Sequence, residues 1–461
     1  MRRAAALAAA LALGGCMVGP DYRRPDLQVP GAFAESEGKG APLGTVPAQW
    51  WMLYGDPLLD DLVKAGLERN ADVRLAAARV EEAEAALREA RATLLFPLVQ
   101  GQAGASRGRT IQLGTQNTFS LGLSTSFEID LWGRLRRAER STRDALLASR
   151  YGEDTVALTL AATIARTYFA ALSLDSQLAA SDESLRAAQD SLDLAQKRLN
   201  GGVGSALDVY QAGALRSSTA AQSKEIARQR AAIAHQLGLL TGRLDIVVPA
   251  KDLAAIPIPT LPPAGLPSAV LERRPDVRQA EAALMGATER IGVARASQFP
   301  TLSLSGSFGV QSSDIDRLFS TGSRVWSAGA GLLGPVIDAG RYAARTDQAV
   351  AQARQAEATY QRAVETAFRD VSDALSNVRY AADSEADLAT RVDDARGALR
   401  LAQLRYQRGY SAYLEVLDAE RTLNDAQLAF IRNRQAYLSF TVDLMNALGG
   451  GWTDAEATAR K

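Results

Sequence analysis

The distribution of proline constrains this chain more than any other feature of its sequence. All sixteen prolines lie between residues 20 and 97, between residues 249 and 300, or at Pro335. The two remaining stretches, residues 98–248 and 336–461, contain none. Because proline removes a backbone hydrogen bond and clashes with the preceding helical turn, its absence permits helices much longer than the few turns that are usual in globular domains.

Helical periodicity fills most of these proline-free stretches. Over residues 134–200 the sequence is rich in Ala, Leu, Gln, Arg and Glu, and apolar residues recur every three or four positions. A helix of this length would extend about 100 Å. We expect further helices over residues 206–240 and 57–95, the latter with Asp56 as its N-cap and Pro57 at its first position.

The second half of the chain repeats the first, which predicts two copies of one structural unit. We place the first repeat at residues 56–248 and the second at residues 276–448, each with a helix, a strand pair, a long helix and a shorter helix. A proline-rich connector over residues 249–275 is expected to lie extended against the helices. Residues that recur about 207 positions later are Arg198, Gly202, Leu207, Val209 and Ala212, as Arg405, Gly409, Leu414, Val416 and Ala419. In the second repeat the predicted helices cover residues 341–408 and 411–448, and a tail follows over residues 449–461.

Strand periodicity appears between the helices of each repeat, within residues 97–131 and 300–337. In residues 118–129, for example, large apolar residues alternate with Ser, Gly and Glu. A half-buried sheet of a soluble protein would alternate in the same way. However, about ten residues tilted by about 45° also suffice to cross the apolar layer of an outer membrane.

Four strands cannot close a barrel, because about eight are needed even for a barrel filled by side chains. In lipid an open sheet edge leaves backbone groups without hydrogen bonds, which is prohibitively costly. The chain should therefore oligomerise. Small polar residues on one face favour an open lumen, and hence three copies and about twelve strands over two copies and eight strands.

The N-terminus has the order of a secretory signal, which we assign to residues 1–15. Arg2 and Arg3 precede an apolar run that is too short to span a membrane, and two glycines follow it. The only cysteine of the chain, Cys16, comes next. The sequence Leu13-Gly14-Gly15-Cys16 resembles a bacterial lipobox, which implies lipidation of Cys16. A lipid-anchored, extended segment over residues 16–55 would then precede the first repeat.

Composition argues against most enzymes and against nucleic-acid binding. The chain has 52 basic and 52 acidic residues, so it offers no net field to attract a polyanion. One cysteine and one histidine do not provide Cys/His metal sites or the usual nucleophilic relays. The glycines at positions 329, 331 and 334 fit a dinucleotide-binding pattern, but Pro335 follows where a phosphate-binding helix would start. We therefore expect no catalytic, cofactor or metal site.

Several separate motifs, in this order, resemble those of TolC-like outer-membrane efflux proteins, in the lipoprotein branch that includes OprM- and NodT-like channels. The resemblance runs from Cys16 to about Leu448. Its motifs begin with the stretch Val18-Gly19-Pro20-Asp21-Tyr22 and continue with residues 126–134, 272–277, 299–300, 334–341 and 413–419. It implies a mainly α fold with an internal tandem repeat, in which three chains form a 12-stranded outer-membrane β-barrel continued by a long periplasmic α-helical barrel.

The resemblance also implies a function and partners. Such proteins are exit ducts for drugs and small toxic compounds, joined by a periplasmic adaptor to an inner-membrane pump of the resistance-nodulation-division type. The same channel could instead serve a type I protein secretion system. A lipid-anchored periplasmic coiled-coil scaffold without a pore is an alternative from another class.

The family closes its periplasmic end with the turns between the long helices, and the resemblance assigns gate residues there. Glu415 and Asp418 would form an acidic ring beside an apolar constriction at Leu414. Arg421 could pair with Asp418 at the i, i+3 spacing. The residues that match a closed-state hydrogen bond between the two hairpins are Asp208 and Tyr406. Ser411 stands where some relatives have a basic residue.

Overall fold

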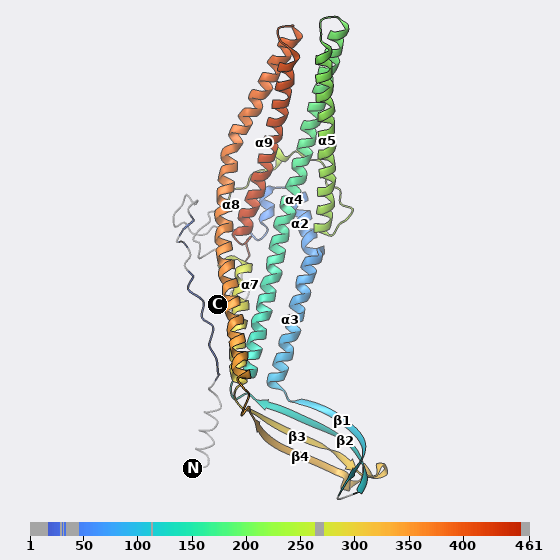
Figure 1. Ribbon diagram of the computed structural model, residues 1–461, viewed down its shortest axis with the longest axis vertical. Coiled ribbons are helices and arrows are strands. Elements are labelled where there is room, and N and C mark those ends of the chain that lie inside the picture. Colours follow the sequence, from blue (N-terminus) through green and yellow to red (C-terminus); the bar gives the residue numbers. More distant parts are fainter. Residues whose placement is uncertain are drawn as a thin grey trace. The chain divides into compact units, whose positions relative to one another are not determined.

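The computed structural model describes residues 17–27, 30, 32–33, 46–111, 114–262 and 272–452. These residues are mostly helical, with one four-stranded antiparallel sheet (Figure 1), as the predicted fold class requires. The predicted signal peptide and Cys16 lie outside the described residues. The main elements are α2 (Pro57–Arg69), α3 (Ala71–Leu95), β1 (Leu98–Thr110), β2 (Gly114–Ile129), α4 (Arg134–Asn200), α5 (Ala206–Thr241), α7 (Pro275–Ala296), β3 (Thr301–Ser312), β4 (Arg324–Leu333), α8 (Arg341–Gln407) and α9 (Tyr413–Ala447). Short 3-10 turns are η1 (Trp50–Tyr54), η2 (Leu253–Ala255), η3 (Ile315–Arg317) and η4 (Thr321–Ser323).

The single helix predicted over residues 57–95 is wrong, because the chain breaks at Asn70 into α2 and α3. Asn70 has an extended conformation, and its side-chain oxygen accepts a hydrogen bond from the Asp72 amide at 2.7 Å. Its side-chain nitrogen donates to the Leu240 carbonyl at 3.0 Å. A side chain that caps one helix and binds a residue 170 positions away favours the break over a continuous helix.

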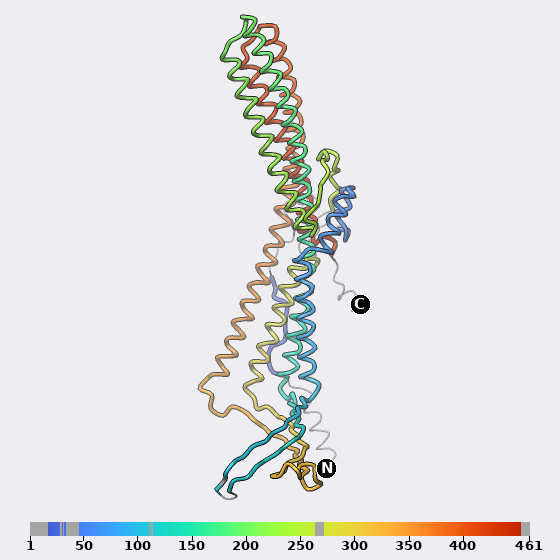
Figure 2. Tube along the Cα trace, turned by 90° about the vertical axis from the view of Figure 1, so that its right-hand side faces the viewer, coloured from blue at the N-terminus to red at the C-terminus, as the bar shows by residue number. Residues whose placement is uncertain are grey.

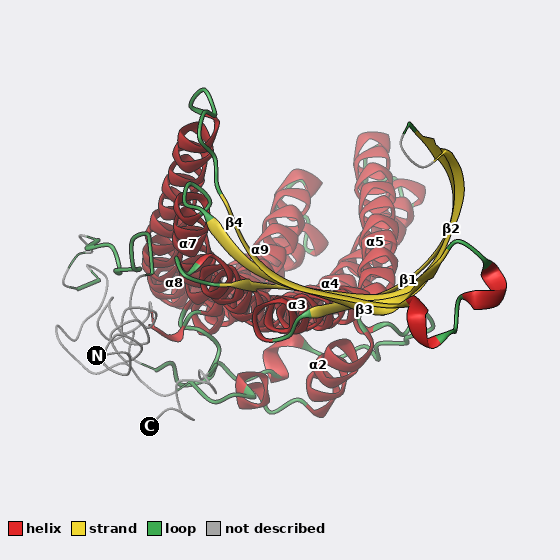
Figure 3. Cartoon of the chain, turned by 90° about the horizontal axis from the view of Figure 1, so that it is seen from below, coloured by secondary structure: helices red, strands yellow, loops and turns green. Residues whose placement is uncertain are grey.

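The four strands form one curved sheet in the order β1-β2-β3-β4 (Figure 3). Consecutive strands are antiparallel, so each repeat supplies one hairpin and the two hairpins pair through β2 and β3. Within the described sheet β1 and β4 are edge strands, each paired on one side. The sheet therefore has two open edges.

The register gives the two faces of this sheet different chemistry. Residues directly opposite one another across the strands point to the same face. One such row is formed by Gly101, Leu123, Phe308 and Trp326, and its three large side chains are exposed. The neighbouring row, on the other face, is small and polar and consists of Gln100, Ser124, Ser307 and Ser327. An exposed apolar face opposite a polar face is the pattern of a strand that faces lipid on one side and water on the other.

Contacts divide the chain into two compact units that cut across the sequence repeats. The first takes the chain up to Leu27 together with Ala78–Tyr151 and Arg278–Ala363, and it holds the sheet. The second takes Gln28–Ala77, Gly152–Val277 and Val364–Lys461. Each unit thus receives segments from both repeats, and α4 and α8 contribute to both units.

The second unit holds the largest hydrophobic core. Trp50, Tyr54, Tyr168 and Phe169 are fully or almost fully buried in it, and Leu253 of the predicted connector packs in the same cluster. An 18-residue stretch of α4 is apolar enough to cross a membrane by length and composition, but 56% of it is buried within the protein. The apolar residues of this stretch are therefore largely part of the hydrophobic core.

Asp56 ties the start of α2 to this core. As predicted, it is the N-cap, accepting a hydrogen bond from the Leu58 amide at 3.0 Å. Its other oxygen accepts hydrogen bonds from the Tyr168 hydroxyl at 2.7 Å and from the Lys251 ammonium at 2.8 Å. Although burial acts to raise its pKa, these hydrogen bonds hold the pKa of Asp56 below its usual value.

Candidate functional site

The two helical hairpins α4–α5 and α8–α9 each end in a short turn (Figure 2), and the two turns have the same backbone hydrogen bonding. In the first, Gly202 has a positive φ of 76°, and the Val203 amide donates to the Arg198 carbonyl at 3.0 Å. In the second, Gly409 has a φ of 77° and the Tyr410 amide donates to the Arg405 carbonyl at 2.8 Å. Both are Schellman ends, in which glycine adopts the left-handed conformation that other residues avoid. The repeat in the sequence is therefore also a repeat in the backbone.

Contacts between the two hairpins begin directly at these turns. Arg198 of α4 donates from Nη1 to the Tyr406 carbonyl at 3.0 Å, and its guanidinium carbon lies 4.7 Å from the centre of the Tyr406 ring. The Tyr406 hydroxyl donates to Oδ2 of Asp208 on α5 at 3.4 Å, a long hydrogen bond. Burial, and then the charge of Asp208, raise the pKa of Tyr406. The structure thus brings together the two residues that the resemblance pairs.

The predicted gate residues Leu414, Glu415 and Asp418 are all exposed on the first turns of α9. Glu415 forms an ion pair with Arg405 of α8, with 3.2 Å between Oε2 and Nε. This pair joins the two helices of one hairpin. Because both partners are about half exposed, water screens much of the attraction.

The expected pairing of Arg421 with Asp418 is absent from the described residues. Both side chains are exposed, so forming the pair would restrict two side chains for little electrostatic gain in water. Arg421 instead lines a cavity between the hairpins. The carboxylate of Asp418 is therefore not neutralised by this arginine.

Ser411, which stands where some relatives have a basic residue, has a buried hydroxyl with no hydrogen-bond partner among the described residues.

Sequence reasoning missed a buried carboxylate on the same helix. Glu420 of α9 is 8% exposed and accepts a hydrogen bond from the Ser191 hydroxyl of α4 at 2.6 Å. It lies three and four positions after Leu417 and Val416, in a row of apolar residues that faces the other hairpin. An acidic residue at the apolar positions of a helix was the available signal.

The fold and these hairpin ends define a class of protein, one that combines membrane-compatible strands with long helical hairpins that meet at their tips. A family model described as outer membrane efflux protein matches residues 62–243 and 266–450. The chain belongs to the outer membrane efflux protein family.

Named relatives and solved structures are similar over nearly the whole chain. The solvent efflux pump outer membrane protein SrpC of Pseudomonas putida is 34% identical, with 96% of this chain and 97% of the relative covered. The cation efflux system protein CusC of Escherichia coli O6:H1 is 33% identical, with the same two coverages. A solved structure of the outer-membrane channel OprN has a TM-score of 0.88 at 30% identity and covers 95% of this chain and all of that one. The open-state structure of the MtrE channel of Neisseria gonorrhoeae has a TM-score of 0.82 at 31% identity and covers 95% of this chain and 98% of that one.

The predicted family, mainly α fold, outer-membrane location and efflux function are thereby confirmed. The lipoprotein branch and the roles of the individual gate residues stay predictions. The domain boundaries drawn from the sequence also stay predictions.

Proposed function

We propose that three copies of this chain close one 12-stranded barrel and act as a passive, gated exit duct. The observation that carries this proposal is the pair of open sheet edges beside an exposed apolar face. In lipid those edges require partners, because unpaired backbone groups have no water to bind.

The strand order supports closure between copies. Four consecutive antiparallel strands leave β1 and β4 running in opposite directions. Placing β4 of one copy beside β1 of the next therefore continues the antiparallel pattern all the way round. Three copies give twelve strands, and the row of small polar residues would then face the lumen.

The hairpin ends are the proposed gate. The contacts of Arg198 with Tyr406, and of Tyr406 with Asp208, hold the two hairpins together, which supports a closed arrangement. In three copies, Glu415 and Asp418 would form a ring of carboxylates next to Leu414. Such a ring attracts cations and repels anions.

The proposed partners are a periplasmic adaptor and an inner-membrane pump of the resistance-nodulation-division type. The proposed cargo is drugs and other small toxic compounds. Relatives are named as solvent and toluene efflux pump outer membrane proteins and as a cation efflux system protein. These names favour a pump for small compounds over a protein secretion system.

Cys16 is the proposed lipid attachment site. Met17, which follows it, belongs to the first unit and packs closely against Gly133. A Cβ atom added to Gly133 would lie only 3.1 Å from the Met17 Cα. The Val18 amide also donates to the Trp132 carbonyl at 3.1 Å.

Reversal potentials across planar bilayers test the gate assignment. We expect the purified protein to pass cations in preference to anions, and the double variant Glu415→Gln/Asp418→Asn to lose most of this preference while its conductance persists. Native mass spectrometry of both proteins should give the mass of three chains. An unchanged reversal potential in the variant would refute the acidic ring, and a mass of one or two chains would refute the barrel.

A further inference from the structure

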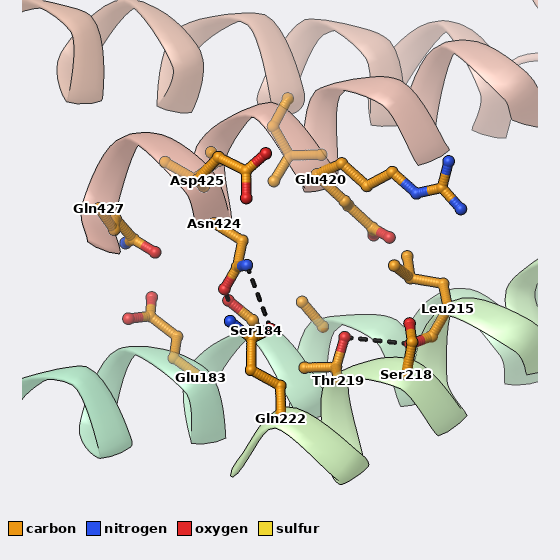
Figure 4. Close-up of a pocket in the computed structure, with 14 residues that line it drawn as sticks. Glu183, Ser184, Leu215, Ser218, Thr219, Gln222, Glu420, Asn424, Asp425 and Gln427 are labelled. Atoms are coloured by element: carbon orange, nitrogen blue, oxygen red, sulfur yellow. Dashed lines mark hydrogen bonds between the residues drawn. The ribbon is translucent and has the colours of Figure 1, made fainter. Parts of the chain in front are cut away.

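The two hairpins enclose space beyond their tip contacts. A cavity of about 330 Å³ is lined by residues of all four helices, α4, α5, α8 and α9 (Figure 4). A second cavity of about 250 Å³ lies among α4, α8 and α9. Glu420 lines the first cavity and Ser191 lines the second, so the hydrogen bond between them joins α9 to α4 where the two cavities meet.

The two oxygens of Glu420 have unequal environments. Oε1 accepts the hydrogen bond from Ser191, whereas Oε2 is buried and makes no well-formed hydrogen bond in the part of the chain that the structure describes, although the Gln403 side chain lies close enough to stabilise its charge. Glu420 also forms no ion pair among those residues. Burying an ionised carboxylate without full hydrogen bonding is unfavourable, so this position favours the protonated form. Burial raises the pKa of Glu420, against the opposing effects of the Ser191 hydroxyl and the Gln403 amide.

The groups around Glu420 do not compensate a negative charge there. The neighbouring residues of α5 and α8 that line the two cavities are uncharged. The titratable and charged residues that line them are Glu183 and Asp190 from α4, Tyr406 from α8, and Tyr413, Arg421 and Asp425 from α9. Of these six, three are carboxylic acids, and the single cation, Arg421, is exposed to water. The Tyr413 hydroxyl is buried without a partner among the described residues, and burial, followed by the charge of Glu420, raises its pKa.

We propose that Ser191 and Glu420 form a proton-sensitive latch, a second contact that positions the hairpins of the gate and buries Glu420, so that the packed arrangement is favoured when Glu420 is protonated. The inference rests on the proposed gating function. When the hairpins separate, the carboxyl group enters water and its pKa returns to the ordinary value of about 4.3. Protonation is therefore coupled to packing of the hairpins.

The sign of the pH dependence follows from the raised pKa. Below about pH 4.3 the carboxyl group is protonated in both arrangements, and the latch contributes its full stabilisation. As the pH rises from that value through the raised pKa, the separated arrangement ionises first and the packed one loses this stabilisation. Acid should hold the hairpins together, and neutral pH should loosen them. Each unit by which packing raises the pKa changes the ratio of separated to packed hairpins by about tenfold.

Distance measurements between the two hairpin tips test the latch. Spin labels would be placed at Val203→Cys and Tyr410→Cys, two exposed positions on opposite tips, in trimers where one labelled chain is diluted among unlabelled chains. With native Glu420, the separated fraction should rise with pH. The Glu420→Gln variant, which is uncharged and nearly the same shape, should stay packed at every pH. Retention of the full pH response in Glu420→Gln would overturn the proposal.

Two further variants separate a latch from a general loss of structure. Glu183→Gln removes another carboxylate that lines the same cavity, and it should keep the native pH profile. Ser191→Ala should lower the packed fraction in acid yet retain a pH response, because the carboxyl group remains. If trimers form and conduct but Glu420→Gln responds to pH like the native protein, only the latch fails. If no trimer forms or none conducts, the proposed function fails instead.

Discussion

Arg137 shows how a single buried cation fixes the N-terminal segment of the first unit. Its side chain is 1% exposed and donates hydrogen bonds to the carbonyls of Gly19 and Pro20 and to the carboxylates of Asp21 and Glu289. The Arg137 side chain has room only because residue 292 is glycine. A Cβ atom added to Gly292 would lie 2.6 Å from the Arg137 Cδ. The short segment after Cys16 is thus held by charge and by hydrogen bonds to its backbone.

Replacing Arg137 by alanine should destabilise the protein by about 3–5 kcal/mol, because Glu289 would keep a buried charge without its partner. Urea denaturation would measure this change, and limited proteolysis should cut more rapidly before Leu27. The matched control is Arg396→Ala, which breaks an exposed ion pair with Asp393 and should cost less than about 1 kcal/mol. Equal losses in the two variants would contradict the role given to Arg137.

At the scale of the elements, β2 presents lipid-compatible and polar side chains on alternate positions. Leu123 is 55% exposed in a row with Phe308 and Trp326, and its neighbour Ser124 points to the opposite face. The strand therefore offers two adjacent positions with the same backbone and opposite surroundings.

Leu123→Arg should cost about 2–4 kcal/mol of folding stability in a bilayer, because the charge would enter the hydrocarbon layer. Ser124→Arg, one residue later, would face the lumen and should leave folding nearly unchanged. The fraction of folded trimer in lipid vesicles over a urea series measures both. If Ser124→Arg proves the more damaging variant, the assignment of the two faces is wrong.

Local sequence signals were enough to predict the long helices and the strands. Absence of proline, glycine at the turns, and periods of two or about 3.6 residues are all readable from neighbouring positions, and α4 begins and ends at residues 134 and 200, where these signals place it. The break at Asn70 depends on the distant Leu240 carbonyl, and the buried Glu420 depends on Ser191, 229 positions away. The sequence around a residue does not identify such long-range partners, although an acidic residue at an apolar helix position was itself a local signal at Glu420.

The predicted pair between Asp418 and Arg421 failed for a related reason. Their spacing permits contact on a helix, but spacing alone does not say whether water competes. Both side chains are exposed, so the pair gains little. The resemblance to a family supplied the pairing of Tyr406 with Asp208, which no spacing rule would have given.

At the scale of the whole molecule, two repeats in each chain supply two strand pairs and two hairpins. In a trimer this makes six similar units arranged around one axis, which suits a duct, because every unit contributes equally to the wall. In the proposed mechanism the hairpins determine whether the duct is open. We propose that contacts between them close a pore that already exists.

Single-channel conductance across planar bilayers tests this claim most directly, with the purified native protein compared with the double variant Arg198→Ala/Tyr406→Phe. The variant loses the hydrogen bond to the Tyr406 carbonyl, the contact over its ring and the bond to Asp208. At about 1 kcal/mol for each lost hydrogen bond, the open fraction should rise roughly tenfold or more. We predict rare, small openings in the native protein and frequent, larger ones in the variant. Failure of folded trimers of both proteins to conduct would contradict the account.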